Sequence, residues 1–157
     1  MSVVLVRVDD RLIHGQIVVG WVQALGVKRV VLVDDAVSGN EWERELYTLS
    51  VPPGLRVEFA SVVEATEMMA EWMGSPDRTI VLVGNVETII ELCNGTDQIK
   101  KVNVGGLHDA TGRTQRLPYV YLSEDEAAGL RALGENGIEV TAQDVPTARP
   151  VALRGFT

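Results

Sequence analysis

The sequence predicts a doubly wound α/β fold, with a mainly parallel sheet of about seven strands and helices on both faces. Short β-branched segments alternate with longer amphipathic segments along the 157 residues, and this alternation is typical of βαβ units. The first strand segment, residues 3–8, is apolar almost throughout, as expected of a strand that is covered on both faces. No linker, internal repeat or low-complexity segment interrupts the pattern. We therefore expect one domain over residues 1–157.

Each element follows from its own residues. The strand segments are rich in valine, isoleucine and leucine and are bounded by turn-forming residues; they cover residues 3–8, 29–33, 55–60, 79–84, 101–104, 119–122 and 138–142. The helical segments place apolar residues three and four positions apart; they cover residues 15–25, 40–51, 61–73, 86–92 and 123–136. Residues 105–118 form the longest stretch without periodicity. Such long loops are often functional.

Capping residues mark the starts and ends of these helices. Three Ser or Asn residues are followed three positions later by Glu, as in a capping box: Ser61 with Glu64, Ser123 with Glu126, and Asn40 with Glu43. Asn85 is in position to cap the helix that follows it, and Gly26 to end the first helix.

Composition narrows the class of protein. The net charge of −8 argues against nucleic acid as a partner, since binding to a phosphate backbone depends on clustered Lys and Arg. No apolar run approaches the roughly 18 residues that a membrane span needs, and the amino terminus lacks the features of a secretory signal. We expect a cytoplasmic protein. Its single cysteine, Cys93, forms neither an internal disulfide nor a multi-thiolate metal site, and no metal or cofactor is predicted.

A functional site is expected at the carboxyl ends of the parallel strands, where open α/β sheets bind their ligands. The polar and glycine residues that follow predicted strands are Asp9, Asp10, Arg11, His14, Asp34, Asp35, Asn85, Gly105, Gly106, His108 and Asp109. Every α/β domain places polar loop residues at this edge, so their presence alone does not establish a site.

The loop around His14 carries the most specific chemistry. His14 comes just before a predicted helix, where unpaired backbone N–H groups and the positive end of the helix dipole favour an anion. Arg11 supplies a planar cation suited to phosphate oxygens, and Gly15 with Gln16 is predicted to bind phosphate at the helix start. An imidazole with an ordinary pKa of about 6.5 is mostly neutral at pH 7 and can attack phosphorus. The loop is therefore suited to a phosphohistidine carrier, although the residues alone favour a capping or hydrogen-bonded loop histidine without chemistry.

The other ionisable residues at this edge give weaker evidence of a catalytic role. Asp9 and Asp10 are open to a structural role as turn and cap formers. Adjacent residues of an extended segment point to opposite faces, so we do not expect them to act as a carboxylate pair. His108 lies in a glycine-rich loop with no helix close behind it. A direct catalytic role is therefore less expected for His108 than for His14.

The segment Val-Arg-Val-Asp-Asp-Arg-Leu-Ile-His-Gly-Gln at 6–16, followed by Trp21, resembles the phosphorylation-site signature of a known family. This family comprises the sugar-specific IIB components of the mannose/fructose/sorbose phosphotransferase system (PTS). The stretches 31–35, 53–54, 103–108 and 143–146 also resemble that family in kind and order, so the similarity covers essentially the whole chain. Residues 36–41 match the family only loosely, and residues 84–96 lack an expected Asn-Pro pair.

The resemblance implies a sugar phosphotransferase component. It implies that His14 is phosphorylated on Nδ1 by a phosphohistidine of the IIA component, and that membrane components IIC and IID present the sugar that accepts the phosphoryl group. Arg11 matches the arginine of that family that stabilises the phosphate. Asp10 matches an acidic loop residue, for which the resemblance implies at most an orienting role. Neither the identity of the sugar nor the oligomeric state follows from it, and a homo-oligomer is compatible with it.

Two other functions compete with this one. In one, phosphorylation of His14 controls a protein–protein interaction without any sugar transport, because a phosphate adds about −1.5 to −2 charges to a surface. In the other, the chain is a nucleotide-binding α/β domain. The first strand-to-helix turn lacks both glycine-rich phosphate-binding motifs, which argues against the second.

Overall fold

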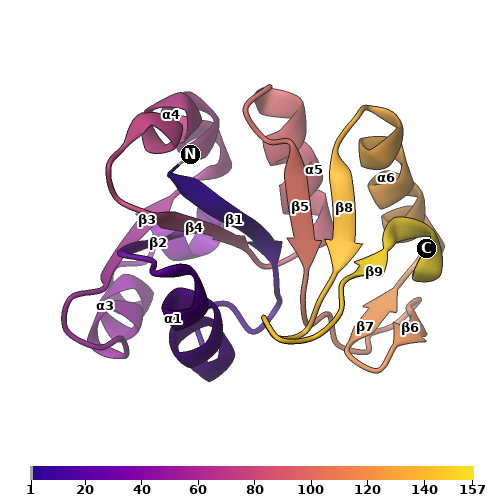
Figure 1. The fold of residues 1–157 in the computed structure, drawn as a ribbon, viewed down its shortest axis with the longest axis horizontal. Coiled ribbons are helices and arrows are strands. Elements are labelled where there is room, and N and C mark those ends of the chain that lie inside the picture. Colours follow the sequence, from indigo (N-terminus) through magenta and orange to yellow (C-terminus); the bar gives the residue numbers. More distant parts are fainter. Residues whose placement is uncertain (1) are drawn as a thin grey trace.

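The computed structural model describes residues 2–157, which form a three-layer α/β structure (Figure 1). Within these residues the main sheet has seven strands in the order β3-β2-β4-β1-β5-β8-β9. Its strands are β1 (Val3–Val8), β2 (Arg29–Val33), β3 (Arg56–Ala60), β4 (Thr79–Val83), β5 (Lys101–Val104), β8 (Glu139–Ala142) and β9 (Val151–Ala152). All neighbouring strands pair in parallel except β9, which runs antiparallel to β8. The predicted doubly wound, mainly parallel fold is confirmed.

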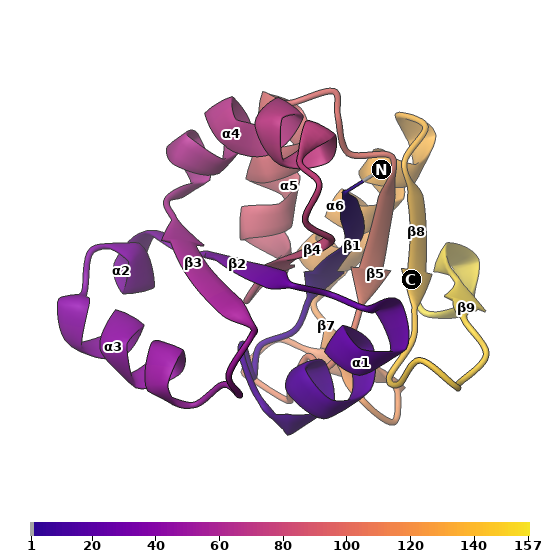
Figure 2. The same cartoon turned by 60° about the vertical axis from the view of Figure 1, so that its left-hand side comes forward.

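Helices cover both faces of the sheet (Figures 1 and 2). They are η1 (Gln16–Trp21), α1 (Val22–Leu25), α2 (Asp35–Ser38), α3 (Glu41–Leu49), α4 (Val62–Gly74), α5 (Val86–Gly95), α6 (Glu124–Glu135) and η2 (Leu153–Gly155). Helices α4, α5 and α6 pack on one face, while η1, α1 and α2 pack on the other. None of these helices is long and apolar enough to cross a membrane.

The alternation of side chains along a central strand shows how the sheet separates two cores. Val31 and Val33 of β2 belong to the cluster beneath α4, α5 and α6, whereas Val30 and Leu32 belong to the cluster beneath η1 and α1. Successive side chains of a strand point to opposite faces, so a continuous apolar strand serves both cores. This explains why the central strands β2 and β4 are apolar after their first residue.

The predicted caps are largely confirmed. Ser61 and Ser123 form complete capping boxes with Glu64 and Glu126. Asn40 and Asn85 each accept one hydrogen bond from the backbone three residues on, as N-caps. Gly26 ends α1 with a left-handed φ of 63°, a conformation that costs glycine little.

The second half of the sheet differs from the prediction. Residues 114–117, expected to be loop, form strand β6 (Thr114–Leu117), which pairs antiparallel with β7 (Val120–Leu122) in a separate two-stranded sheet. The expected strand 119–122 is therefore outside the main sheet, where the two-residue β9 is the seventh strand. β6 is mostly exposed and carries one apolar residue, Leu117, so it lacks the alternation on which strand prediction depends.

Two helices also differ in detail. The short helix α2, capped by the side chain of Asp34, was not predicted, because four residues are too few to show a helical period. The predicted helix 15–25 is divided into a π-helical turn, η1, and α1. Single π-turns of this kind occur frequently at functional sites.

Candidate functional site

Three loops meet at the carboxyl ends of β1, β5 and β8. Gly105 N–H donates to the carbonyl of Val8 at 2.7 Å, and Asp10 N–H donates to the carbonyl of Gly106 at 2.8 Å. Gln143 N–H donates to the carbonyl of Val104 at 2.9 Å. These bonds join the loop that contains His14 to the loops that follow β5 and β8.

A buried carboxylate, Asp9, organises this edge. Its Oδ1 accepts hydrogen bonds from the backbone N–H and the Nε of Arg11, at 3.1 and 2.9 Å, and its Oδ2 accepts one from Arg11 Nη2 at 2.8 Å. Arg7 Nη2 adds a bond of 3.2 Å to Oδ2. Burial acts to raise the pKa of Asp9, but the hydrogen bonds and positive charges of Arg11 and Arg7 outweigh it and lower that pKa below its usual value.

Arg7 pairs with Asp9 from the interior of the protein. Its side chain is fully buried, and its guanidinium donates to the side-chain oxygen of Asn103 and to the carbonyls of Gln143 (2.8 Å) and Asp144 (3.0 Å). The same guanidinium lies 4.9 Å from the ring centroid of Trp21, within range of a cation–π contact. Burial lowers the pKa of Arg7 despite its partner Asp9, yet an arginine stays charged in a protein.

Arg11 is held less deeply than Arg7. About a quarter of its side chain is exposed, and its Nη2 also lies 3.8 Å from a carboxylate oxygen of Asp144. The hydrogen bonds that Arg11 donates to Asp9 raise the pKa of Arg11. Among residues 2–157 its Nη1 has no hydrogen-bond partner. The guanidinium therefore keeps donors available for an additional anion.

Two glycines make room for these guanidinium groups. A Cβ atom on Gly105 would lie 2.2 Å from Arg7 Nη2, and one on Gly106 would lie 2.9 Å from Arg11 Nε. Both distances are well below van der Waals contact. The Gly-Gly pair after β5 is therefore required for the packing of the Arg7–Asp9–Arg11 cluster.

His14 lies at the start of η1, as predicted. The backbone N–H of Val18 donates to the His14 carbonyl at 3.0 Å, and Gly15 is the N-cap residue. The ring Nδ1 lies 2.8 Å from the carbonyl oxygen of Leu12, so Nδ1 carries the proton in this bond. Nε2 is shielded from solvent and has no partner among the described residues. In this conformation neither ring nitrogen presents a lone pair to solvent.

The carbonyl that binds His14 belongs to a strained residue. Leu12 has a φ of 59° and is the one non-glycine residue with positive φ between residues 2 and 157. The left-handed conformation costs a residue with a Cβ atom about 1–2 kcal/mol. The side chain of Leu12 packs so closely over Gly84 that a Cβ there would lie 2.8 Å from it. The ring orientation of His14 therefore depends on a backbone conformation that the surrounding contacts impose.

The two predicted phosphate-binding residues differ in their surroundings. Gly15 is exposed, has ordinary helical dihedral angles, and has no heavy atom within 4 Å of the position of an added Cβ. Its conformation and internal packing do not require glycine. The side-chain oxygen of Gln16 is buried without a hydrogen-bond partner among residues 2–157.

Among residues 2–157, Asp10 forms its side-chain hydrogen bonds with His108 and none with His14. Its two carboxylate oxygens accept from the backbone N–H of His108 at 2.7 Å and contact His108 Nδ1 at 2.5 Å. Arg113 donates to the His108 carbonyl at 2.9 Å and forms a bidentate pair with Glu126 of α6. Asp10 therefore holds the loop after β5 in place, and the His108 side chain stays 68% exposed.

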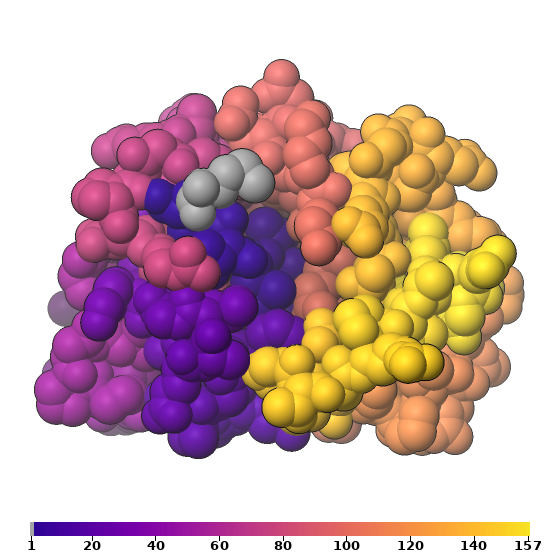
Figure 3. Space-filling model, viewed as in Figure 1, coloured from indigo at the N-terminus to yellow at the C-terminus, as the bar shows by residue number. Residues whose placement is uncertain are grey.

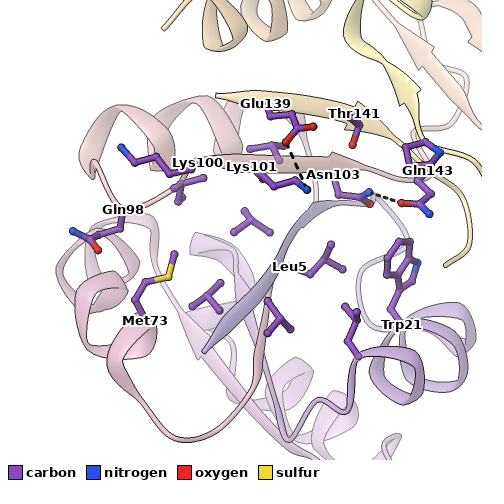
Figure 4. Close-up of a pocket in the computed structure, with 17 residues that line it drawn as sticks. Leu5, Trp21, Met73, Gln98, Lys100, Lys101, Asn103, Glu139, Thr141 and Gln143 are labelled. Atoms are coloured by element: carbon purple, nitrogen blue, oxygen red, sulfur yellow. Dashed lines mark hydrogen bonds and ion pairs between the residues drawn. The ribbon is translucent and has the colours of Figure 1, made fainter. Parts of the chain in front are cut away.

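A hollow lies beside this site and not at it. It has a volume of about 390 Å³ and lies over β1, β5 and β8, on the part of the sheet that α1 leaves uncovered (Figure 4). Trp21, Asn103 and Gln143 line it and also surround Arg7. Figure 3 shows the segment after β8 lying against α1, where Trp21 Nε1 donates to the carbonyl of Asp144 at 3.4 Å. None of the five predicted site residues lines this hollow.

Sequence reasoning missed several members of the cluster. Arg7 was assigned to the interior of a strand and Asp9 to a turn, while Asn103, Gln143 and Asp144 were noted only as matching stretches. A charged residue in an otherwise apolar, doubly covered strand was the available signal, because such a residue needs a buried partner. Within residues 2–157 no three His, Cys, Asp or Glu residues are grouped closely enough to hold a metal ion.

The geometry defines an α/β protein with a histidine at the first helical turn after β1 and a buried arginine–aspartate cluster beside it. The sequence model of the "PTS system sorbose subfamily IIB component" family matches residues 3–156. The chain belongs to this family of sugar-specific phosphotransferase components, as the sequence motif predicted.

Individual relatives agree with this assignment. The chain is 29% identical over 147 residues to the N-acetylgalactosamine-specific phosphotransferase enzyme IIB component 1 of Escherichia coli K12, and the match covers 92% of each protein. It is 31% identical over 147 residues to the mannose-specific EIIAB component of the same organism, covering 94% of this chain and 46% of that protein. The crystal structure of the IIBSor domain of the sorbose permease from Klebsiella pneumoniae superposes with a TM-score of 0.88 at 26% identity, covering 99% of this chain and 96% of that domain.

Proposed function

We propose that this chain is a cytoplasmic phosphohistidine carrier of a sugar phosphotransferase system. It accepts a phosphoryl group on His14 from a phosphohistidine of a IIA component and passes it to a sugar presented by membrane components IIC and IID. Family membership supports the phosphotransferase role. The observation that carries the assignment of the residue is the position of His14 at the start of η1, three residues after an arginine fixed by a buried carboxylate.

Two in-line displacements make up the proposed reaction. A ring nitrogen of His14 attacks the phosphorus, a new N–P bond forms, and the N–P bond of the donor histidine breaks with its electron pair returning to that ring. In the second step a sugar hydroxyl attacks the phosphorus, the bond to His14 breaks, and the hydroxyl proton passes to a base at the acceptor site. Catalysis of such transfers rests mainly on positioning and on stabilising charge on the phosphoryl oxygens.

Arg11 is the proposed phosphate-stabilising residue. Its pairing with Asp9 fixes the guanidinium plane, while Nη1 keeps its donors for a phosphoryl oxygen. A pre-oriented donor costs less to use at the transition state than a free side chain does. Gly15 and Gln16 are proposed to contribute the backbone N–H groups at the start of η1.

The proposal requires the His14 loop to move. Nδ1, the nitrogen that the family resemblance implies as the phosphorylated one, lies 2.8 Å from the Leu12 carbonyl. For Nδ1 to attack, the ring must leave that carbonyl and carry its proton on Nε2. We propose that the strained peptide at Leu12, with its φ of 59°, is where the loop opens when the donor protein binds.

The test is phosphorylation by phosphorylated IIA, followed by transfer to sugar. We expect acid-labile phosphate on the wild-type protein, none on His14→Ala, and slower labelling of Arg11→Ala. His108→Ala, which removes the other imidazole of the chain, is the matched control and is expected to be labelled normally. Equal labelling of His14→Ala would overturn the assignment. Labelling without any transfer to sugar in the presence of the membrane components would favour the regulatory alternative.

A further inference from the structure

Helix α3 exposes a continuous apolar face. Trp42, Leu46 and Leu49 are 69%, 50% and 76% exposed. Residues four and seven positions apart lie on the same side of a helix, so the three side chains form one stripe, called here the α3 outer face. Contiguous exposed apolar surface is unusual in a monomeric protein and marks sites of interaction.

The core does not require this stripe. The side of α3 that faces the sheet carries Glu43, Arg44 and Tyr47, all partly buried, and the Tyr47 ring lies 6.4 Å from that of Phe59 in β3. A surface helix normally turns its most apolar side towards the core. In α3 the bulky apolar residues point outwards instead, and one of them is tryptophan, which is enriched at the energetic centres of interfaces.

α3 begins close to the sheet edge that holds His14. α3 follows the carboxyl end of β2, after the short helix α2 and the N-cap Asn40. Only β4 separates β2 from β1 in the sheet, so the carboxyl ends of β2 and β1 are about 10 Å apart. In Figures 1 and 2, α3 lies at the periphery on the same side of the sheet as α1. A partner with a standard interface of about 800 Å² per side can cover both α3 and the His14 loop.

Charge decides which partner fits. Glu41 and Glu45 flank the stripe and are exposed, and the chain carries a net charge of −8. A second copy would bring the same acidic residues against each other, and an anionic lipid surface would also be repelled. A surface with an apolar centre and a basic rim is complementary. The cytoplasmic loops of integral membrane proteins carry an excess of Lys and Arg.

We propose that the α3 outer face is the docking surface for the cytoplasmic loops of the integral-membrane components that present the sugar. This inference rests on the proposed function and adds the surface by which the phosphorylated carrier is held at the membrane. Docking through α3 brings the neighbouring His14 loop towards the sugar site. The acidic flanks and the apolar stripe together select a basic protein surface over lipid.

The experiment measures binding of the full chain to phosphatidylcholine vesicles that contain the purified membrane components. We expect the double variant Trp42→Ser/Leu46→Ser to bind about 10-fold or more weakly than the wild type, with phosphorylation by IIA and the melting temperature unchanged because both side chains are exposed. Val63→Ser is the matched control, since Val63 is a 68% exposed apolar residue on a different helix, α4. It is expected to bind like the wild type.

Each other outcome contradicts the proposal in a recognisable way. If the double variant binds as tightly as the wild type, α3 is not part of the interface with the membrane components. If IIA phosphorylates the double variant more slowly than the wild type, the α3 outer face binds the donor protein. If the wild type sediments as a dimer and the double variant as a monomer, this face binds a second copy of the chain. If the chain binds vesicles that lack the membrane components, and this binding depends on Trp42, the α3 outer face binds lipid. Failure of the wild type to be labelled on His14 would overturn the proposed function instead, and the labelling assay reports it separately.

Discussion

Arg11 and Asp9 form a bidentate pair, in which Arg11 Nε donates to Oδ1 at 2.9 Å and Nη2 donates to Oδ2 at 2.8 Å. The carboxylate is fully buried, whereas the guanidinium is partly exposed. The pair therefore connects the interior, through Arg7, to the surface next to His14. Parallel hydrogen bonds between charged groups fix an orientation as well as adding energy, so the cluster sets the position of Arg11.

The first prediction concerns Asp9→Asn. The amide keeps the shape of the carboxylate but leaves the buried Arg7 without a counter-charge, so we expect a loss of about 3 kcal/mol in the free energy of unfolding. Phosphorylation of His14 should also slow, because Arg11 loses its fixed orientation. Denaturant unfolding and labelling by phosphorylated IIA measure the two effects.

Asp144→Asn is the matched control for this variant. Asp144 is partly exposed and lies 3.8 Å from Arg11, so its loss should change stability by less than about 1 kcal/mol. If the Asp9 and Asp144 variants were equally stable, Asp9 would not be the centre of the cluster.

A second prediction concerns the glycines after β5. Gly106→Ala places a Cβ 2.9 Å from Arg11 Nε, so Arg11 must shift and labelling of His14 should slow while the fold is retained. Gly105→Ala meets the buried guanidinium of Arg7 at 2.2 Å, which cannot move aside, and overpacking of this kind costs about 1–3 kcal/mol or more. Thermal unfolding and phosphorylation kinetics separate the two variants.

Gly74→Ala serves as the control, since an added Cβ at this helix end has no heavy atom within 4 Å. It should leave both stability and labelling unaffected. Normal labelling of Gly106→Ala would show that Arg11 tolerates displacement and that its present position is not required.

The third prediction is a dependence of stability on pH. The arginines hold the pKa of Asp9 below its ordinary value of 3.8, so the folded state binds a proton at Asp9 less readily than the unfolded state does. The stabilisation from this group is therefore complete above about pH 4–5 and is lost as the pH falls through the lowered pKa of the folded state. Urea unfolding between pH 2.5 and 7 should show this loss.

Asp9→Asn lacks this titration and should lose less stability on acidification than the wild type. Glu126 provides a comparison, because burial raises its pKa but Arg113 and the N-cap of α6 outweigh that effect and lower it. Glu126→Gln should keep the contribution of Asp9. An identical acid profile for the wild type and Asp9→Asn would contradict a lowered pKa of Asp9.

A fourth prediction concerns Cys93. Burial in an apolar environment raises the pKa of its thiol to about 11, so little thiolate is present near neutral pH. We expect a thiol reagent at pH 8 to react slowly with the folded protein and rapidly in 6 M guanidinium chloride. Rapid reaction of the folded protein would contradict the burial of Cys93 between α5 and its neighbours.

The sequence allowed the parallel sheet to be predicted because its central strands are continuously apolar and their helices carry recognisable caps. Val30 to Val33 serve two cores at once, and this requirement leaves a clear signature. β6 and β9 were missed for the opposite reason. They lie at the margin, bury little, and depend on tertiary pairing with β7 and β8, which no local pattern records.

The candidate site was predictable only in part. The motif identified His14 and Arg11, and the structure places them in one loop at the predicted edge. The partners of Arg7 were not found, because Arg7 and Asp144 are 137 residues apart and single-sequence periodicity carries no information on such contacts. Asp10 was expected to have at most an orienting role, with no partner named. Its partner, His108, lies 98 residues away.

The last prediction concerns which nitrogen of His14 carries the proton before phosphorylation. A carbonyl oxygen is only an acceptor, so the 2.8 Å contact between Leu12 O and His14 Nδ1 fixes the Nδ1–H form of the neutral ring. Long-range ¹H–¹⁵N spectra at pH 8 should show a protonated Nδ1 and an unprotonated Nε2, with His108→Ala used to assign the signals. Leu12→Gly, which relieves the strain of the positive φ, should loosen this preference and speed labelling by IIA. A ring protonated on Nε2 in the free protein would mean that His14 is already prepared for attack through Nδ1 and that no opening at Leu12 is needed.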